Sequence, residues 1–248
     1  TLIAMFGYEK SVCGDAIMRT FDYTGMRCDE MATLQGYREL DKGSFFSKQR
    51  QESWGLQYKA IYLANMLEEN RFRFENISEE RADYWIAQAN FIKAYMYFDL
   101  ARNWGDVPLA PGTESINEVP KSSVDTILQE AIRCAEIALI LPVHDKLTDA
   151  SGNSVSSKQY ASLGTVHTLL ANIYAWMGGL YGKEEYWRKA EEHASLVIDK
   201  KVGFYDLEKT IGEMRDKTLG SGRNSDETIF SIAINSQDED RYWINFFE

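Results

Sequence analysis

Residues 87–109, AQANFIKAYMYFDLARNWGDVPL, decide the fold class of this chain. Apolar residues recur there at helical spacing on two faces. One stripe is Tyr84, Ala87, Phe91, Ala94, Tyr95, Phe98 and Ala101, and the other is Trp85, Ala89, Ile92, Met96 and Leu100. A surface helix normally carries a single apolar stripe. We therefore predict a helix with neighbours on both sides, as in a stacked helical array, with only a strip around Asn90, Lys93 and Tyr97 left to water.

The ends of this helix are also encoded in the sequence. Ser78 is a suitable N-cap, and Gly105 can take the positive φ that closes a helix. Pro108 cannot continue a helix because it lacks the backbone N–H. These signals predict a helix over residues 78–103.

Similar periodicity predicts five further helices, at about residues 1–18, 49–68, 123–141, 157–177 and 184–200. Ser122 and Asp125 fit the start of the helix at 123–141, and Gly178-Gly179 fits the end of the helix at 157–177. Residues 228–234 are β-branched and predict a short strand. Helix pairs with small and aromatic residues at these places favour an all-α fold of stacked, tetratricopeptide-like hairpins with long irregular loops.

Six segments, in order along the chain, resemble the SusD/RagB family of surface lipoproteins, which capture glycans for an outer-membrane transporter. The long helix running into Trp104-Gly105-Asp106-Val107-Pro108 is similar to the signature of the family, and residues 119–142, 158–177, 186–206 and 227–234 resemble its later segments. The helix at 49–68 matches a Trp-x3-Tyr-x-Ala-Ile-x3-Asn pattern. The residues that carry the structural motif are Trp54, Tyr58, Asn65, Tyr95, Gly105, Asp106 and Pro108.

This resemblance implies a fold, a function and a location. Residues 1–248 are expected to form one helical domain, matched over about residues 20–235, with the C-terminal part of the family largely absent. The implied function is non-catalytic binding of a glycan or other nutrient, which is delivered to a TonB-dependent, SusC-like transporter. The implied location is the outer-membrane surface, with a lipid anchor on a cysteine upstream of this sequence and no other contact with the membrane.

The resemblance also implies that part of the glycan platform lies at about residues 23–52, in a long loop rich in aromatic and charged residues. The expected glycan contacts are Arg27, Asp29, Glu30, Tyr37, Phe45 and Phe46. Salt bridges within the loop are an equal alternative for Arg27, Asp29 and Glu30. The spacing of Trp54, Trp85, Trp104, Trp176 and Trp187 instead predicts core positions.

Composition excludes several classes of function. A net charge of −11 argues against nucleic acid as a partner, because phosphate binding needs a basic patch. The sequence contains no run of about 18 apolar residues, so it predicts no membrane-spanning helix. The sequence also lacks the phosphate-binding and dinucleotide-binding glycine patterns, and we expect no cofactor.

The three cysteines and three histidines show no metal-like spacing. Cys134 is predicted to be a buried small side chain, while Cys13 and Cys28 are either free or paired. His144, His167 and His193 lie in separate segments, and His167 falls on an apolar helical face typical of a core histidine.

Two other functions fit the same sequence. A tetratricopeptide-type scaffold would bind proteins in a groove lined by polar residues of its inner helices. A glycoside hydrolase would need two carboxylates about 5–10 Å apart in a pocket. No acidic residue is singled out for that role, and Asp106 is better interpreted as a turn former after the long helix.

Overall fold

The computed structural model describes residues 5, 8, 12, 54–110, 112–114, 118–149, 152–155, 158–219 and 225–232. Its helices are α3 (Gly55–Glu69), α4 (Glu79–Trp104), α5 (Val124–Ile137), α6 (Leu163–Tyr181), α7 (Glu184–Ile198) and α8 (Ile211–Glu213). Short 3-10 turns occur at Arg71–Arg73, Ala138–Ile140 and His144–Lys146, and a π-helical segment covers Met214–Leu219. Strands β1 (Val107–Pro108) and β2 (Lys121–Ser122) form a small antiparallel pair.

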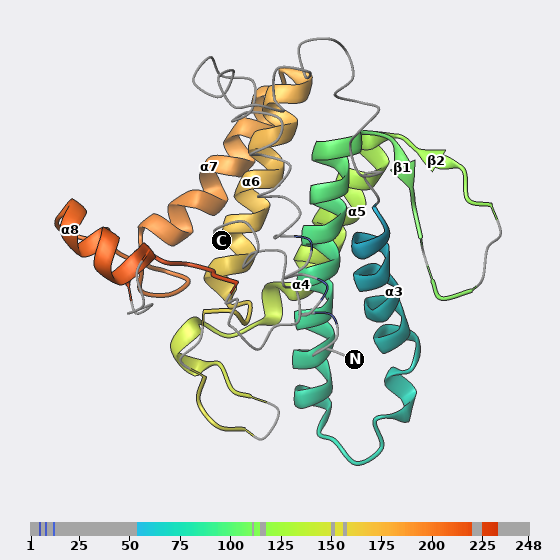
Figure 1. The fold of residues 1–248 in the computed structure, drawn as a ribbon, viewed down its shortest axis with the longest axis horizontal. Helices are drawn as coiled ribbons and strands as arrows, with labels where there is room; N and C mark the ends of the chain where they lie inside the picture. Colours follow the sequence, from blue (N-terminus) through green and yellow to red (C-terminus); the bar gives the residue numbers. More distant parts are fainter. Residues whose placement is uncertain are drawn as a thin grey trace, which may run out of the picture.

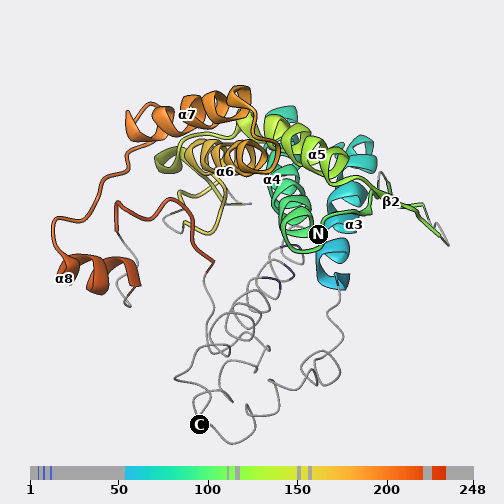
Figure 2. The same ribbon diagram turned by 90° about the horizontal axis from the view of Figure 1, so that it is seen from above.

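The five long helices form a stacked array. Helix α4 packs against both α3 and α5, and α6 packs against α5 and α7 (Figure 1). Seen from above, α5 and α7 lie in one row and α4 and α6 in the row beside it (Figure 2). This arrangement confirms the prediction of an all-α fold of stacked helices. No described helix has the length and hydropathy of a membrane span.

Local capping explains where α4 and α5 begin and end. The Ser78 hydroxyl accepts the Arg81 N–H at the start of α4, and Gly105, at φ 69°, closes it. The cap of α5 is Ser123, whose hydroxyl accepts the Thr126 N–H, so the prediction of Ser122 as the start signal is wrong. Ser122 instead pairs with Val107 in the β1–β2 ladder, which keeps its backbone extended.

Helix α6 differs from its prediction at both ends. It begins at Leu163, because Ser162 and Thr165 form a capping box, and residues 158–162 are not helical. It runs on through Gly178-Gly179 to Tyr181 and is closed by Gly182 at φ 65°. Gly178 has a packing role instead, since a Cβ there would lie 2.7 Å from the Trp187 ring on α7.

The strip of α4 predicted to face water is buried, and that prediction is wrong. Asn90, Lys93 and Tyr97 are 0%, 2% and 0% exposed. Polar partners on α3, α5 and the segment after α4 cover this strip, so α4 is enclosed on a third side as well as on its two apolar faces. Helix α4 is therefore the centre of the core.

Two further predictions are corrected. Trp54, Trp85 and Trp104 are partly buried, but Trp176 and Trp187 are 41% and 50% exposed, so the core prediction is wrong for these two. Residues 228–232 form no strand, while residues 233–234 lie outside the described residues.

The segment at 225–232 is fastened to the helices by side chains. The Lys158 ammonium donates to the carbonyls of Ser225, at 3.0 Å, and Thr228. The Phe230 ring lies edge-on to Phe91 of α4, with 5.3 Å between centroids. Of the helix predicted at 1–18, only Met5, Tyr8 and Val12 are described, and each is helical.

Candidate functional site

Side chains of α3 and α4 fasten the chain segment that follows α4. The Tyr58 hydroxyl donates to the Pro108 carbonyl at 2.5 Å. The Asn65 amide donates to the carbonyls of Ala110 and Gly112, at 2.9 and 3.2 Å. The Tyr97 hydroxyl donates to the Ala110 carbonyl at 3.1 Å and accepts the Ala110 N–H at 3.2 Å. Burial raises the pKa of the Tyr58 and Tyr97 phenols, so both remain protonated donors.

The remaining motif residues also have structural contacts. Trp54 meets Tyr58 and Trp104 edge-on, with centroids 6.2 and 6.3 Å apart. The Asp106 carboxylate accepts the Val124 N–H at 2.8 Å and so caps the first turn of α5. Tyr95 is partly buried against the main core. These residues thus build a frame around the end of α4.

A charged network crosses the array beneath this frame. The buried Lys93 ammonium on α4 lies 3.1 Å from the Glu68 carboxylate on α3 and 3.8 Å from Glu130 on α5. Asn90 donates to Glu68 at 2.6 Å, and Arg133 binds Glu130 through two hydrogen bonds of 2.7 Å. Two cations thereby balance two carboxylates across three helices.

The ionisation of this network is set by competing effects. Burial on its own would raise the pKa of Glu130, but the hydrogen bonds and charge of Arg133, with the charge of Lys93, lower it overall. The Glu130 carboxylate is therefore ionised, and its oxygens interact with Arg133 and Lys93. Cys134 is buried, as predicted, and burial raises the pKa of its thiol to about 12.

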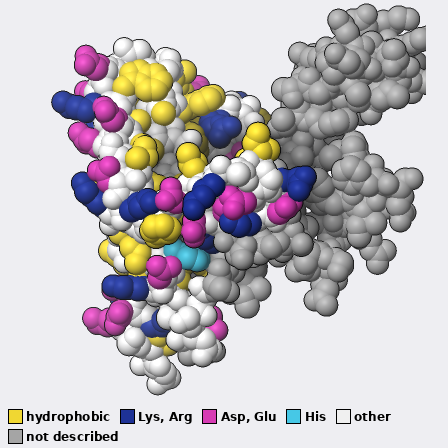
Figure 3. All heavy atoms as spheres, turned by 90° about the vertical axis from the view of Figure 1, so that its left-hand side faces the viewer, with side chains coloured by type: hydrophobic (Ala, Val, Ile, Leu, Met, Phe, Trp, Pro, Cys, Tyr) yellow, Lys and Arg dark blue, Asp and Glu magenta, His cyan; other side chains and the backbone are white. Residues whose placement is uncertain are grey.

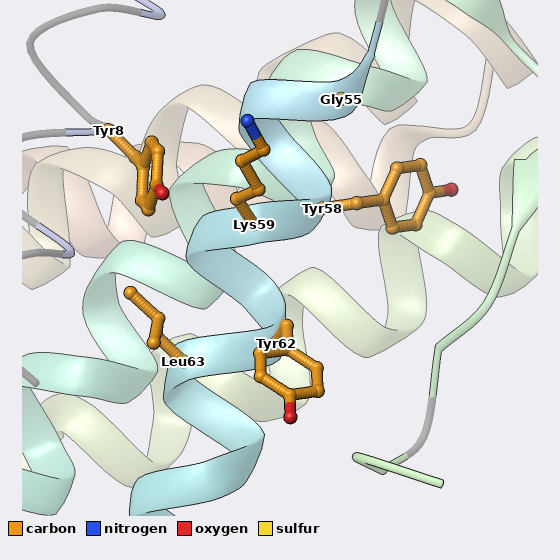
Figure 4. A pocket seen from close by; sticks show the side chains of 6 residues that line it. All are labelled: Tyr8, Gly55, Tyr58, Lys59, Tyr62 and Leu63. Carbon is orange, nitrogen blue, oxygen red and sulfur yellow. The ribbon is translucent and has the colours of Figure 1, made fainter. Parts of the chain in front are cut away.

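A hollow lies beside α3 among the described residues. It has a volume of about 410 Å³ and is lined by Tyr8, Gly55, Tyr58, Lys59, Tyr62 and Leu63 (Figure 4). The Lys59 ammonium lies 5.6 Å from the centroid of the Tyr8 ring. Tyr62 is 49% exposed.

The side chains of this hollow do not all converge. Figure 4 shows Tyr8, Lys59 and Leu63 on one side of α3, whereas Tyr58 points to the other side, where its hydroxyl is bound to Pro108. The hollow is therefore an open contact surface rather than an enclosing pocket. Within the described ranges, no three His, Cys, Asp or Glu side chains are grouped to hold a metal ion.

The surface elsewhere carries charges of both signs. On the face with α7 and α8, Lys and Arg side chains alternate with Asp and Glu, and hydrophobic side chains lie between them (Figure 3). Near the C-terminal end of α4, the Arg102 guanidinium lies between Phe98 and the exposed Trp176, at 5.2 and 5.5 Å from their ring centroids. Among the described side chains that Figure 3 shows, no single basic patch of the kind that binds nucleic acid is present.

The structure does not test the glycan contacts inferred from the sequence. Arg27, Asp29, Glu30, Tyr37, Phe45 and Phe46 all lie outside the described residues, as do Cys13 and Cys28. Sequence reasoning also missed the buried role of Lys93, although a lone cation between two apolar stripes is a usable signal. It did not bring together His167 and His193, which meet between α6 and α7.

Comparison with known proteins gives consistent matches. Residues 13–146, just over half of the chain, match a SusD-like family described as starch-binding and associating with the outer membrane. The SusD-like protein P25 of Formosa agariphila is 29% identical over 92 residues, which cover 36% of this chain and 18% of that protein.

Solved structures show the same fold. A SusD superfamily protein of Bacteroides thetaiotaomicron aligns with a TM-score of 0.69 at 19% identity, over 92% of this chain and 53% of its own. NanU of Bacteroides fragilis aligns with a TM-score of 0.62 at 18% identity, over 79% of this chain and 37% of its own. The chain thus spans about half or less of the length of these relatives. From the family match and the fold together, the chain belongs to the SusD/RagB family.

Proposed function

We propose that this protein binds a glycan or another nutrient at the outer-membrane surface and does not transform it. The observation that carries the proposal is the match of residues 13–146 to a family described as starch-binding and associating with the outer membrane. The helical array supports it, because the motif residues of α3 and α4 form a rigid frame of the kind that can present binding loops.

Three described carboxylates have structural roles that do not fit hydrolysis. A glycosidase needs two carboxyl groups facing one pocket. Asp106 is occupied as a cap of α5, and Glu68 and Glu130 are bound to Lys93 within the helical array. None of these three lines the hollow on α3.

The proposed ligand contacts are the residues inferred from the resemblance. Tyr37, Phe45 and Phe46 would stack on sugar rings, and Arg27, Asp29 and Glu30 would bind hydroxyl groups at the ring edges. Residues 1–248 would act as one helical domain that supports this platform. In the same proposal a lipid anchor holds the protein at the membrane, and the helical array docks on a TonB-dependent, SusC-like transporter.

Replacing Tyr37, Phe45 and Phe46 together with alanine should weaken glycan binding at least about tenfold. Each stacked aromatic contact contributes about 0.5–1.5 kcal/mol, and tenfold corresponds to about 1.4 kcal/mol. Affinity electrophoresis of the intact protein in gels with different polysaccharides measures the change. The matched control is Tyr62→Ala in the hollow on α3, which should retain the retardation of the wild type.

The outcomes of this experiment separate the alternatives. Equal retardation of the triple variant and the wild type would show that the loop aromatics do not bind the glycan. Loss of retardation in Tyr62→Ala alone would move the site to α3. If the wild type is not retarded by any glycan, binding of a non-glycan nutrient or of a protein replaces the proposal.

The proposed transporter partner predicts a stable complex. The protein, extracted from outer membranes in mild detergent, should co-purify with a TonB-dependent barrel in near-equal amounts. Mass spectrometry of the purified complex identifies the barrel. Purification of the protein alone from membranes that contain the barrel would contradict the docking role while leaving glycan binding intact.

A further inference from the structure

Two histidines from neighbouring helices meet where α6 packs against α7. The Nδ1 atom of His167 on α6 lies 2.8 Å from the Nδ1 atom of His193 on α7. The ring centroids are 5.1 Å apart and the ring planes differ by 39°, so the rings meet nearly head to head. His167 is only 9% exposed. This contact joins two helices that lie side by side in Figure 1.

A hydrogen bond between two Nδ1 atoms constrains the protons on both rings. One ring must donate its Nδ1–H, and the other must present a bare Nδ1 as acceptor. A neutral pair satisfies this rule with two different tautomers, and a pair with one extra proton satisfies it as well. With both rings protonated, two N–H groups and two positive charges face each other, and the bond is lost.

The surroundings disfavour added positive charge. Helix α6 contains no Asp, Glu, Lys or Arg. On α7, the Lys189 ammonium opposes protonation of His193, and the mostly exposed Glu192 favours it. From α5, Glu136 acts on Tyr174, whose ring stacks on His193 at 5.6 Å and carries the Lys189 ammonium 4.9 Å above it. Burial lowers the pKa of both histidines, and for His193 the charges of His167 and Lys189 add to that effect.

The geometry favours a proton rather than a metal ion between the rings. Zinc binds histidine nitrogens at about 2.0–2.1 Å, so two nitrogens on one tetrahedral zinc lie about 3.4 Å apart. The observed 2.8 Å is a hydrogen-bond distance. Within the described ranges no third His, Cys, Asp or Glu completes a metal site with this pair.

We propose that His167 and His193 form a proton-operated latch that holds α7 on α6 while at least one ring is neutral and releases it when both are charged. Release would uncover the inner face of α7, where Ala190 and Val197 are buried. The device would couple the local pH to the exposure of one edge of the helical array. It stands independently of what the protein binds.

The sign of the pH dependence follows from the direction of the shifts. In the unfolded or opened state both histidines regain an ordinary pKa of about 6.5, which lies above their values in the folded state. The stabilisation from the latch is therefore fully present above about pH 6.5 and is lost as pH falls through that value. Carboxylates titrate about two pH units lower and contribute little in this window.

Hydrogen exchange of the intact protein in the presence of a chelator tests the latch. Between pH 7.5 and 5.5, after correction for intrinsic exchange rates, protection of α7 amides should fall about tenfold. This is the factor expected when the closed pair excludes one proton over the one pH unit below about pH 6.5. Amides of α4 are the internal reference. In the double variant His167→Gln with His193→Gln, which carries no titratable ring at either position, the same amides should show less than a twofold change.

A second measurement on the wild type keeps the test independent of how well the variant folds. Imidazole ¹⁵N shifts at pH 7.5 should show one ring protonated at Nδ1 and the other at Nε2. Two identical tautomers, or an equal fall in α7 protection in the double variant and the wild type, would overturn the latch. Zinc-dependent protection of α7 in the wild type and not in the variant would also overturn it, in favour of a metal site.

Discussion

Replacing Lys93 with methionine is expected to destabilise the protein by about 3–5 kcal/mol, the usual cost of removing one partner from a buried charged network. Methionine fits the same volume, so the loss comes from charge rather than from a cavity. The change leaves the Glu68 and Glu130 carboxylates facing each other across α4, with Arg133 as the remaining cation on Glu130. Urea unfolding followed by circular dichroism measures the free energy of unfolding.

Two further variants isolate the electrostatic cause. Lys201→Met removes an exposed partner, whose ammonium is 3.2 Å from Asp199, and should change stability by less than about 1 kcal/mol. The double variant Lys93→Met with Glu68→Gln should recover at least about 1 kcal/mol relative to Lys93→Met, because one uncompensated carboxylate is gone. A cost below about 1 kcal/mol for Lys93→Met, or no recovery in the double variant, would show that the network does not hold the three helices together.

Replacing Asn65 with alanine should cost about 2–4 kcal/mol. The variant loses two hydrogen bonds, to the carbonyls of Ala110 and Gly112, and leaves a small cavity at a position that is 1% exposed. The segment after α4 should also loosen, so that limited proteolysis cuts residues 105–121 faster than in the wild type. Thermal unfolding and mass mapping of the first cuts measure the two effects.

The control for this prediction is Asn103→Ala. The Asn103 amide also donates to a backbone carbonyl, that of Asp99 at 2.8 Å, but it lies on the exposed side of α4. It should cost less than about 1 kcal/mol. If Asn65→Ala abolished glycan retardation while the protein remained folded and resistant to protease, Asn65 would be a ligand contact rather than part of the frame.

The extent of α4 could be predicted because its signals are local. The N-cap at Ser78, the apolar repeats and Gly105 lie within one stretch, and the observed helix, Glu79–Trp104, differs by one residue at each end from the prediction. The role of its polar strip could not be predicted in the same way. The partners of Lys93 are 25 and 37 residues away in sequence, on helices whose relative rotation a hydropathy pattern does not contain.

The role of Gly178 could not be predicted for a related reason. The sequence predicts that Gly178 ends a helix, but the Trp187 ring of α7 packs against it, a contact between helices that the local sequence does not contain. The binding site depends even less on periodicity. The contacts expected at Arg27, Asp29, Glu30, Tyr37, Phe45 and Phe46 rest on family resemblance alone, because loop side chains that bind a ligand follow no repeat along the chain.

We expect this protein to capture a glycan without cleaving it. Calorimetric titration of the intact protein with a panel of oligosaccharides, with a reducing-sugar assay on the same samples, tests this claim most directly. We predict saturable binding of at least one glycan class and no release of reducing ends over many hours. Saturable binding accompanied by a steady increase in reducing ends would contradict the claim and identify an enzyme.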